Sequence, residues 1–246
     1  MAIVKLSAVV LKCVSFGESS VIATIFSLDH GLLKCAVRGG RKHGKSSIPI
    51  DRGITAEFTV YLKENRDVHN ISDYLVIDTY EDISKSIVKA TIRDFAFEIF
   101  LLMITDPNPH PNLYSLLTGF LSTVNQSLEN DIYPFYLWLF MYRLLQFEGL
   151  SFVEQSCVSC GNALLGDITL NNRMGGFECP NCTSEGINRV IPHTLIEKLS
   201  GKTKEPISNE IKKKAHSITK IFVEYIRYNT GSSFKLKSAD VLFTLF

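Results

Sequence analysis

The sequence predicts an α+β protein in which a small five-stranded barrel is followed by an all-α helical domain that carries a four-cysteine zinc knuckle. Three observations lead to this prediction. Short runs rich in Val, Ile, Thr, Phe and Tyr end near residue 77, and beyond residue 80 apolar residues recur at helical intervals. Four of the 6 cysteines stand as two close pairs in the helical part. We therefore expect two domains, residues 1–79 and 80–246, with the zinc-binding insertion at about 155–190.

The strand prediction for the first domain depends on short apolar runs that turn residues separate. The predicted strands cover residues 3–13, 20–27, 32–38, 54–62 and 69–77. The longest connection is a polar, glycine-containing loop over residues 39–51. Five short strands in so small a domain favour a closed barrel, because closure removes the exposed strand edges.

The helix prediction for the second domain depends on a change of period. In residues 83–104 apolar side chains recur every three or four positions, as one buried helical face requires. Similar patterns predict helices over residues 113–128 and 133–147. The proline-rich segment 106–111 lies between helices, because proline lacks an amide donor and disfavours helical geometry in the residue before it. Two more helices are predicted, over 208–228 with Ser208 as N-cap and from residue 238 onward.

The composition indicates a globular chain, 46% hydrophobic and 21% charged, and it excludes intrinsic disorder. The net charge is only +1, so affinity for a polyanion must come from local clusters of cations. Lys5 and Lys12 interrupt the N-terminal apolar segment, which therefore lacks the core of a secretion signal. The longest apolar stretches, residues 95–104 and 132–145, are shorter than the roughly 20 residues of a membrane span. We expect a cytoplasmic protein with reduced cysteines and no membrane partner.

The paired cysteines predict a metal site. Two residues separate the cysteines within each pair, a spacing that lets both sulfurs of a pair turn toward one ion. The predicted ligands are Cys157, Cys160, Cys179 and Cys182. A catalytic zinc needs an open coordination position, and four cysteines leave none, so we favour structural Zn²⁺. A thiol-redox pair and a chance arrangement are the alternatives.

Cations gather in and around the loop that follows the third predicted strand. A single acid, Asp51, accompanies them, so the local charge contrasts with the near-neutral whole. Glycines and serines in the loop would let a phosphate chain approach the backbone. The predicted nucleic-acid-binding residues are Lys34, Arg38, Arg41, Lys42, Lys45 and Arg52. The alternative is a solvated loop without a partner.

Two further groups of residues bear on nucleic-acid binding. Lysines cluster again at positions 202, 204 and 212–214, as one polar helix face or as a second track for a strand. Exposed aromatic residues of the barrel would stack on bases, and Phe16, Phe58 and Tyr61 are the candidates. The isolated Cys13 and Cys35 lie in apolar runs and are predicted to be packing residues.

Several motifs resemble the bacterial DNA repair and recombination mediator family RecO. Residues 8–12, 16–19, 24–26 and 36–42 resemble the opening barrel and basic loop of that family. Residues 143–149 and the paired cysteines, with Gly161 and Gly175-Gly176 beside them, are similar to its helical domain and zinc knuckle. Individually these motifs are weak apart from the cysteines, but their order agrees over nearly the whole chain.

The resemblance implies an N-terminal oligonucleotide-binding (OB) fold and a helical C-terminal domain. It also implies a non-enzymatic protein that binds ssDNA and dsDNA and anneals complementary strands in recombinational repair of DNA damage. Its implied partners are RecR, the C-terminal tail of the single-strand binding protein SSB and, indirectly, RecA, which it helps to load onto SSB-coated DNA. A protein of this kind would be associated with the nucleoid. The rival interpretations are a zinc-dependent or thiol-redox enzyme, and a protein-interaction scaffold with a structural zinc.

Overall fold

The computed structural model of the chain describes residues 2–38, 48–63, 66–104, 106–128, 134–184, 189–233 and 235–245. The chain divides into two compact units. The first combines Met1–Arg93 with Ile104–Gln126, and the second combines Asp94–Met103 with Ser127–Phe246. In the described part of the chain, no helix is both long and apolar enough to cross a membrane.

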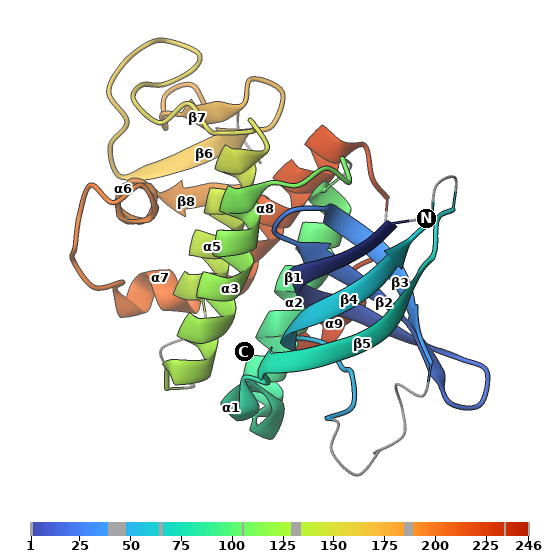
Figure 1. The fold of residues 1–246 in the computed structure, drawn as a ribbon. Helices are drawn as coiled ribbons and strands as arrows, with labels where there is room; N and C mark the ends of the chain where they lie inside the picture. Colours follow the sequence, from blue (N-terminus) through green and yellow to red (C-terminus); the bar gives the residue numbers. More distant parts are fainter. Residues whose placement is uncertain are drawn as a thin grey trace. The chain divides into compact units, whose positions relative to one another are not determined.

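The first unit contains a closed barrel of five strands in the order β1-β2-β3-β5-β4 (Figure 1). Neighbouring strands are antiparallel except β3 and β5, which are parallel. The strands are β1 (Ala2–Phe16), β2 (Ser20–Ser27), β3 (Gly31–Val37), β4 (Thr55–Leu62) and β5 (His69–Asp78). The predicted five-stranded barrel is thereby confirmed, and it has the Greek-key closure of an OB fold.

Alternate residues of each strand fill the barrel, as the period of two requires. Phe58 and Val60 of β4 are buried inside it, together with Ala23 of β2. Cys35 is also fully buried, as predicted, whereas Cys13 is only half-buried. Burial raises the pKa of both thiols to about 12, so the two cysteines behave as packing residues and not as nucleophiles.

Strand β1 is longer than the predicted run over residues 3–13. The pairing of β1 with β2 shifts register between Val10 and Lys12, so Leu11 forms a β-bulge. Beyond the bulge β1 continues, paired with β2, as far as Phe16. The prediction ended too early because residues 14–16 have little to bury: Val14 and Phe16 are both exposed.

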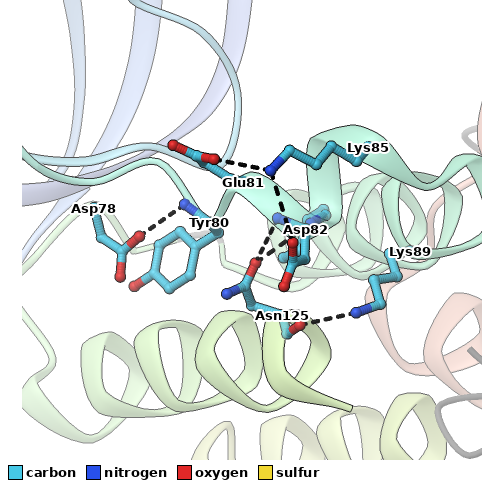
Figure 2. Close-up of polar contacts among 8 residues, drawn as sticks. Asp78, Tyr80, Glu81, Asp82, Lys85, Lys89 and Asn125 are labelled. Atoms are coloured by element: carbon cyan, nitrogen blue, oxygen red, sulfur yellow. Dashed lines mark hydrogen bonds and ion pairs between the residues drawn. The ribbon is translucent and has the colours of Figure 1, made fainter. Parts of the chain in front are cut away.

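The barrel is followed by a tight joint to the first helices of the same unit (Figure 2). Tyr80 adopts a left-handed conformation, φ 48°, and its amide donates to Asp78 Oδ1 at 2.7 Å. Helix α1 (Glu81–Lys85) then begins with its Asp82 and Ile83 amides donating to Asn125 Oδ1 of α3 (Pro111–Gln126). Lys89 Nζ donates in turn to the Asn125 carbonyl at 2.8 Å. Asn125 therefore caps the N-terminus of α1 with its side chain, and its carbonyl at the C-terminal end of α3 accepts a hydrogen bond from a lysine.

The single helix predicted over residues 83–104 is in fact two, α1 and α2 (Ile87–Met103), so this prediction was wrong in part. Ser86 between them is extended, and its hydroxyl accepts from the Lys89 amide at 3.2 Å. A serine that bonds a nearby amide competes with helix continuation and favours a new helix start. The apolar periodicity continues across Ser86, which is why it did not reveal the break.

The second unit contains α5 (Phe135–Phe147), α6 (His193–Leu199), α7 (Asn209–Lys213), α8 (Ala215–Thr230) and α9 (Lys237–Leu245). All of these except α6 lie close to the predicted ranges. Trp138 Nε1 of α5 donates to Thr219 Oγ1 of α8 at 2.9 Å in a buried contact. Ser208 caps α7 as predicted, accepting from the Ile211 amide. The helix predicted over 208–228 is interrupted at Lys214, whose carbonyl accepts from the Ser217 hydroxyl.

A small three-stranded sheet in the second unit had no counterpart in the prediction. Its strands are β6 (Asp167–Asn171), β7 (Gly176–Glu178) and β8 (Val190–Pro192), in the order β7-β6-β8. Helix α6, which directly follows β8, was also missed. Strands of 5, 3 and 3 residues are too short for a periodic pattern to stand out.

Candidate metal centre and nucleic-acid interface

The four predicted metal ligands come together at one end of the small sheet. All four Sγ atoms of Cys157, Cys160, Cys179 and Cys182 lie within 4.8 Å of one another. Cys160 Sγ is 3.8 Å from Cys179 Sγ. Zinc–thiolate bonds of about 2.3 Å in a tetrahedron place sulfurs about 3.8 Å apart, so the cluster fits a four-coordinate metal ion.

Each cysteine pair is held in a tight turn by backbone hydrogen bonds. In the first pair, the Gly161 amide donates to the Cys157 carbonyl at 2.9 Å, and Gly161 itself has φ 76°. In the second pair, the Cys182 amide donates to the Cys179 carbonyl at 3.0 Å. These two similar turns point both cysteines of a pair to the same side, as the two-residue spacing predicted.

Amide donors around the cluster favour thiolate. Burial raises the pKa of Cys157, but backbone amides, first that of Cys179, outweigh it and lower this pKa to about 6. Hydrogen bonds with the sulfurs of Cys160 and Cys179 raise the pKa of Cys182 to about 12. Four sulfurs this close therefore do not all ionise by themselves, and a bound cation is what would stabilise them as thiolates.

The cysteine cluster is joined to the helical core of its unit by aromatic packing. Phe177 of β7 lies two residues before Cys179, and its ring centroid is 5.2 Å from that of Phe152. The Phe152 ring also contacts Tyr225 and Phe222 of α8, at centroid distances of 4.7 and 5.8 Å. Phe152 thus connects the segment that holds the cysteine cluster to helix α8.

The predicted nucleic-acid-binding residues are only partly within the described chain. Lys34, Arg38 and Arg52 are exposed on the barrel unit. Arg52 is fixed by its backbone: its carbonyl accepts from Arg93 of α2, and the next amide, of Gly53, donates to the Val10 carbonyl. The other three predicted residues, Arg41, Lys42 and Lys45, lie outside the described residues.

Strand pairing places an additional cation, Lys12, beside the predicted set. Lys12 of β1 pairs with Thr24 of β2, which pairs with Lys34 of β3, so the two lysines flank Thr24 in one row. The sequence contains Lys12, but its position depends on the bulge at Leu11. A bulge changes the face to which later residues point, and no local pattern revealed it.

The three aromatic candidates for base stacking differ sharply in exposure. Phe58 is 1% exposed and belongs to the barrel core, so its candidacy was wrong. Alternation along the strand did not by itself show which set of residues points into the barrel. Tyr61 is half-buried, whereas Phe16 is 60% exposed at the end of β1.

The structure defines a class of two-part proteins, in which an OB-type barrel is followed by a helical part with a four-cysteine cluster that could hold a metal ion. The family model described as Recombination protein O N terminal matches residues 1–80, and that described as Recombination protein O C terminal matches residues 84–238. The chain belongs to the RecO family, and it has a role in DNA repair and recombination.

Relatives named DNA repair protein RecO resemble the chain over much of its length. The protein of Caldanaerobacter subterraneus subsp. tengcongensis is 24% identical, over 96% of this chain and 97% of the relative. That of Acetivibrio thermocellus is 25% identical, over 81% and 82% respectively. That of Cyanothece sp. is 25% identical over 71% of this chain and 59% of the relative.

Proposed function

We propose that this protein is a DNA-binding recombination mediator that acts without covalent chemistry. It binds ssDNA and dsDNA through their phosphates, anneals complementary strands and, with RecR, assists RecA loading on ssDNA coated by SSB. Its helical part receives the C-terminal tail of SSB. The observation that supports this proposal most directly is the set of exposed cations on an OB-type barrel in a chain of the RecO family.

The proposed mechanism is electrostatic. Lys34, Arg38 and Arg52 with the three loop cations neutralise backbone phosphates without reading the sequence of bases. A second strand is held by the lysines at positions 202, 204, 212 and 213 of the helical part. Two strands bound to one protein meet at a raised effective concentration, and this promotes annealing.

The proposed cofactor is one structural Zn²⁺ held by the four clustered cysteines. Bound zinc would supply charge that keeps all four sulfurs ionised, and so would help to hold together a sheet of three short strands. A thiolate with a lowered pKa, as at Cys157, is also a property of redox cysteines, so the rival enzyme needs a test. Cobalt-substituted protein should show tetrahedral four-sulfur absorption bands that added small ligands leave unchanged, whereas ligand-sensitive bands would support catalysis.

The decisive experiment for DNA binding measures ssDNA affinity against salt. With about four to six phosphates neutralised, the logarithm of the affinity should fall with the logarithm of the salt concentration with a slope of roughly −3 to −4. A quadruple alanine variant at Arg38, Arg41, Lys42 and Lys45 should flatten this slope. An unchanged slope would remove the loop from the DNA-contacting surface.

A matched quadruple variant controls for total charge. Replacing the lysines at positions 202, 204, 212 and 213 by alanine removes the same number of cations from the other unit. This variant should keep the ssDNA slope of the wild-type protein but lose strand-annealing activity, measured with and without SSB. If it flattens the slope as much as the loop variant does, the division of labour between the two surfaces is wrong.

A further inference from the structure

The outward face of β1, β2 and β3 carries an apolar row beside a cationic row. Alternation along β2 places Ala23 inside the barrel, so Ile22 and Thr24 face outward. Strand register then places Val14 beside Ile22, and Ile22 beside Ala36. The next outward row contains Lys12, Thr24 and Lys34. Phe16, opposite Ser20, ends this face at the β1–β2 turn.

Where β1 pairs with β2, the apolar side chains of β1 on this face become exposed beyond the bulge. Val9 and Leu11, before and at the bulge, are buried. Val14 is 48% exposed and Phe16 is 60% exposed. An exposed phenyl ring next to an exposed valine, with cations beside them, is the composition of a binding surface more than of a solvated hairpin. Lys34 of β3 and Arg38, the residue after this strand, are both exposed.

The spacing suits a short length of nucleic acid. Phe16 is four residues from Lys12, which corresponds to about 13 Å along the strand. That distance equals about four stacked nucleotides, which is within the site sizes of single OB folds. A chain whose base lies on the Phe16 ring can therefore place a phosphate near Lys12 or Lys34 within the same short segment.

We infer that Phe16 is a base-stacking residue that makes this barrel face prefer single-stranded over double-stranded nucleic acid. The inference rests on the proposed function, because it concerns the same barrel surface. A phenyl ring needs the free face of a base, and base faces inside a duplex are already stacked on their neighbours. Phosphates are available in both forms, so the cations attract both, and the ring contributes only when bases are unpaired.

Three single variants of the full-length, zinc-loaded protein test this inference. Phe16→Ala removes the ring, and Phe16→Trp keeps a stacking surface and adds an exposed fluorophore. Leu75→Ala is the matched control, because Leu75 is 68% exposed on β5 and lies outside the β1–β2–β3 face. Thermal unfolding checks that each variant folds. Binding is measured by fluorescence anisotropy with an oligothymidylate and with a closed hairpin duplex that has the same number of phosphates.

Phe16→Ala should weaken oligothymidylate binding by about five- to one-hundred-fold and change duplex binding by less than about twofold. Phe16→Trp should retain affinity, and its added emission should be quenched by oligothymidylate but not by the duplex. Leu75→Ala should match the wild type on both. Equal weakening on both DNAs, or no weakening on either, would overturn the inference while leaving the proposed function in place. A wild-type protein that binds neither DNA would overturn both.

A pair of lysine variants tests whether the bound DNA lies on the β1–β2–β3 face. Lys12 and Lys5 are both exposed lysines of β1, but Lys12 pairs toward β2 whereas Lys5 pairs with Thr59 of β4. Lys12→Ala should reduce the steepness of the salt dependence for oligothymidylate by about one unit of slope or slightly less. Lys5→Ala should leave the slope unchanged. If Lys5→Ala reduced the slope and Lys12→Ala did not, the DNA would lie on the β1–β4 side, and the inference would be overturned.

Discussion

The barrel and the cysteine knuckle are both β structures, but different forces stabilise them. The barrel closes on itself through five hydrogen-bonded strand pairs around a continuous apolar core. The knuckle has strands of only 5, 3 and 3 residues, whose buried side chains, such as Phe177, pack on the helical core of the same unit, while its four sulfurs converge on one point. Strand pairing by itself does not stabilise so small a sheet, so packing on the helices and the proposed metal coordination would together stabilise it.

Metal removal should separate the two regions most strongly. Zinc binding is worth about 10–16 kcal/mol in isolated finger peptides, so a chelator should increase amide hydrogen exchange across residues 157–182. Barrel amides of β1–β5 should exchange as before, because no cysteine ligand belongs to the barrel. Hydrogen exchange with mass spectrometry measures both regions in one sample. Equal loss of protection in the barrel would contradict the comparison.

Thiol alkylation should distinguish the two sets of cysteines after the metal is removed. At pH 8 a thiol with a pKa of about 12, as at Cys13 and Cys35, is ionised in about one molecule in ten thousand. Cys157, with a pKa lowered to about 6, is almost fully thiolate at that pH. Peptide mapping after brief iodoacetamide treatment should find label in the knuckle and not in the barrel. Early labelling of Cys35 would show that the barrel opens.

A cavity in the barrel core should affect stability without affecting metal binding. Phe58→Ala removes a buried ring and should lower the free energy of unfolding by about 3–5 kcal/mol, with the stoichiometry of bound zinc unchanged. Leu75→Ala, at an exposed position of the neighbouring strand, should change it by less than about 0.5 kcal/mol. Chemical denaturation and metal analysis measure the two quantities. Loss of zinc in the Phe58 variant would show that the two regions depend on each other.

A methyl group added in the knuckle should have a smaller effect. A Cβ at Gly176 would lie 2.4 Å from Val158 Cγ1 and 2.8 Å from Val153 Cβ. Gly176→Ala should therefore destabilise by about 1–3 kcal/mol and raise the zinc concentration needed for half-saturation. A Cβ added at Gly119 of helix α3 would have no atom of another segment within 4 Å. Gly119→Ala should therefore stabilise the protein by about 0.5–1 kcal/mol. If Gly176→Ala left both the stability and the zinc affinity unchanged, the knuckle would be able to expand around the added methyl group.

The sequence predicted those parts of the molecule that depend on local patterns. The five strands follow from runs of β-branched and aromatic residues, and the cysteine cluster follows from a spacing that only a shared ion explains simply. The apolar period also predicted the longer helices, such as α3 and α5, but not the short α6. The Ser208 cap could be named because a serine before a run containing Glu210 is a local start signal.

The rest could not be predicted because it depends on long-range contacts. Whether Phe16 or Phe58 faces solvent depends on the barrel register and on the bulge at Leu11, neither of which has a local signature. The break at Ser86 depends on its extended conformation as much as on its hydroxyl, and similar serines occur within intact helices. Lys12 was overlooked for the same reason, because its neighbour Lys34 is distant in sequence and only strand pairing brings them together.

Asn125 connects two helix ends whose fluctuations would otherwise be independent. Its side chain accepts from the first amides of α1, and its own carbonyl accepts from Lys89. Displacement of this residue therefore releases both partners in a single opening event. The N-terminus of α1 and the C-terminus of α3 should fray cooperatively, so that the segment leaving the barrel is either wholly ordered or wholly open.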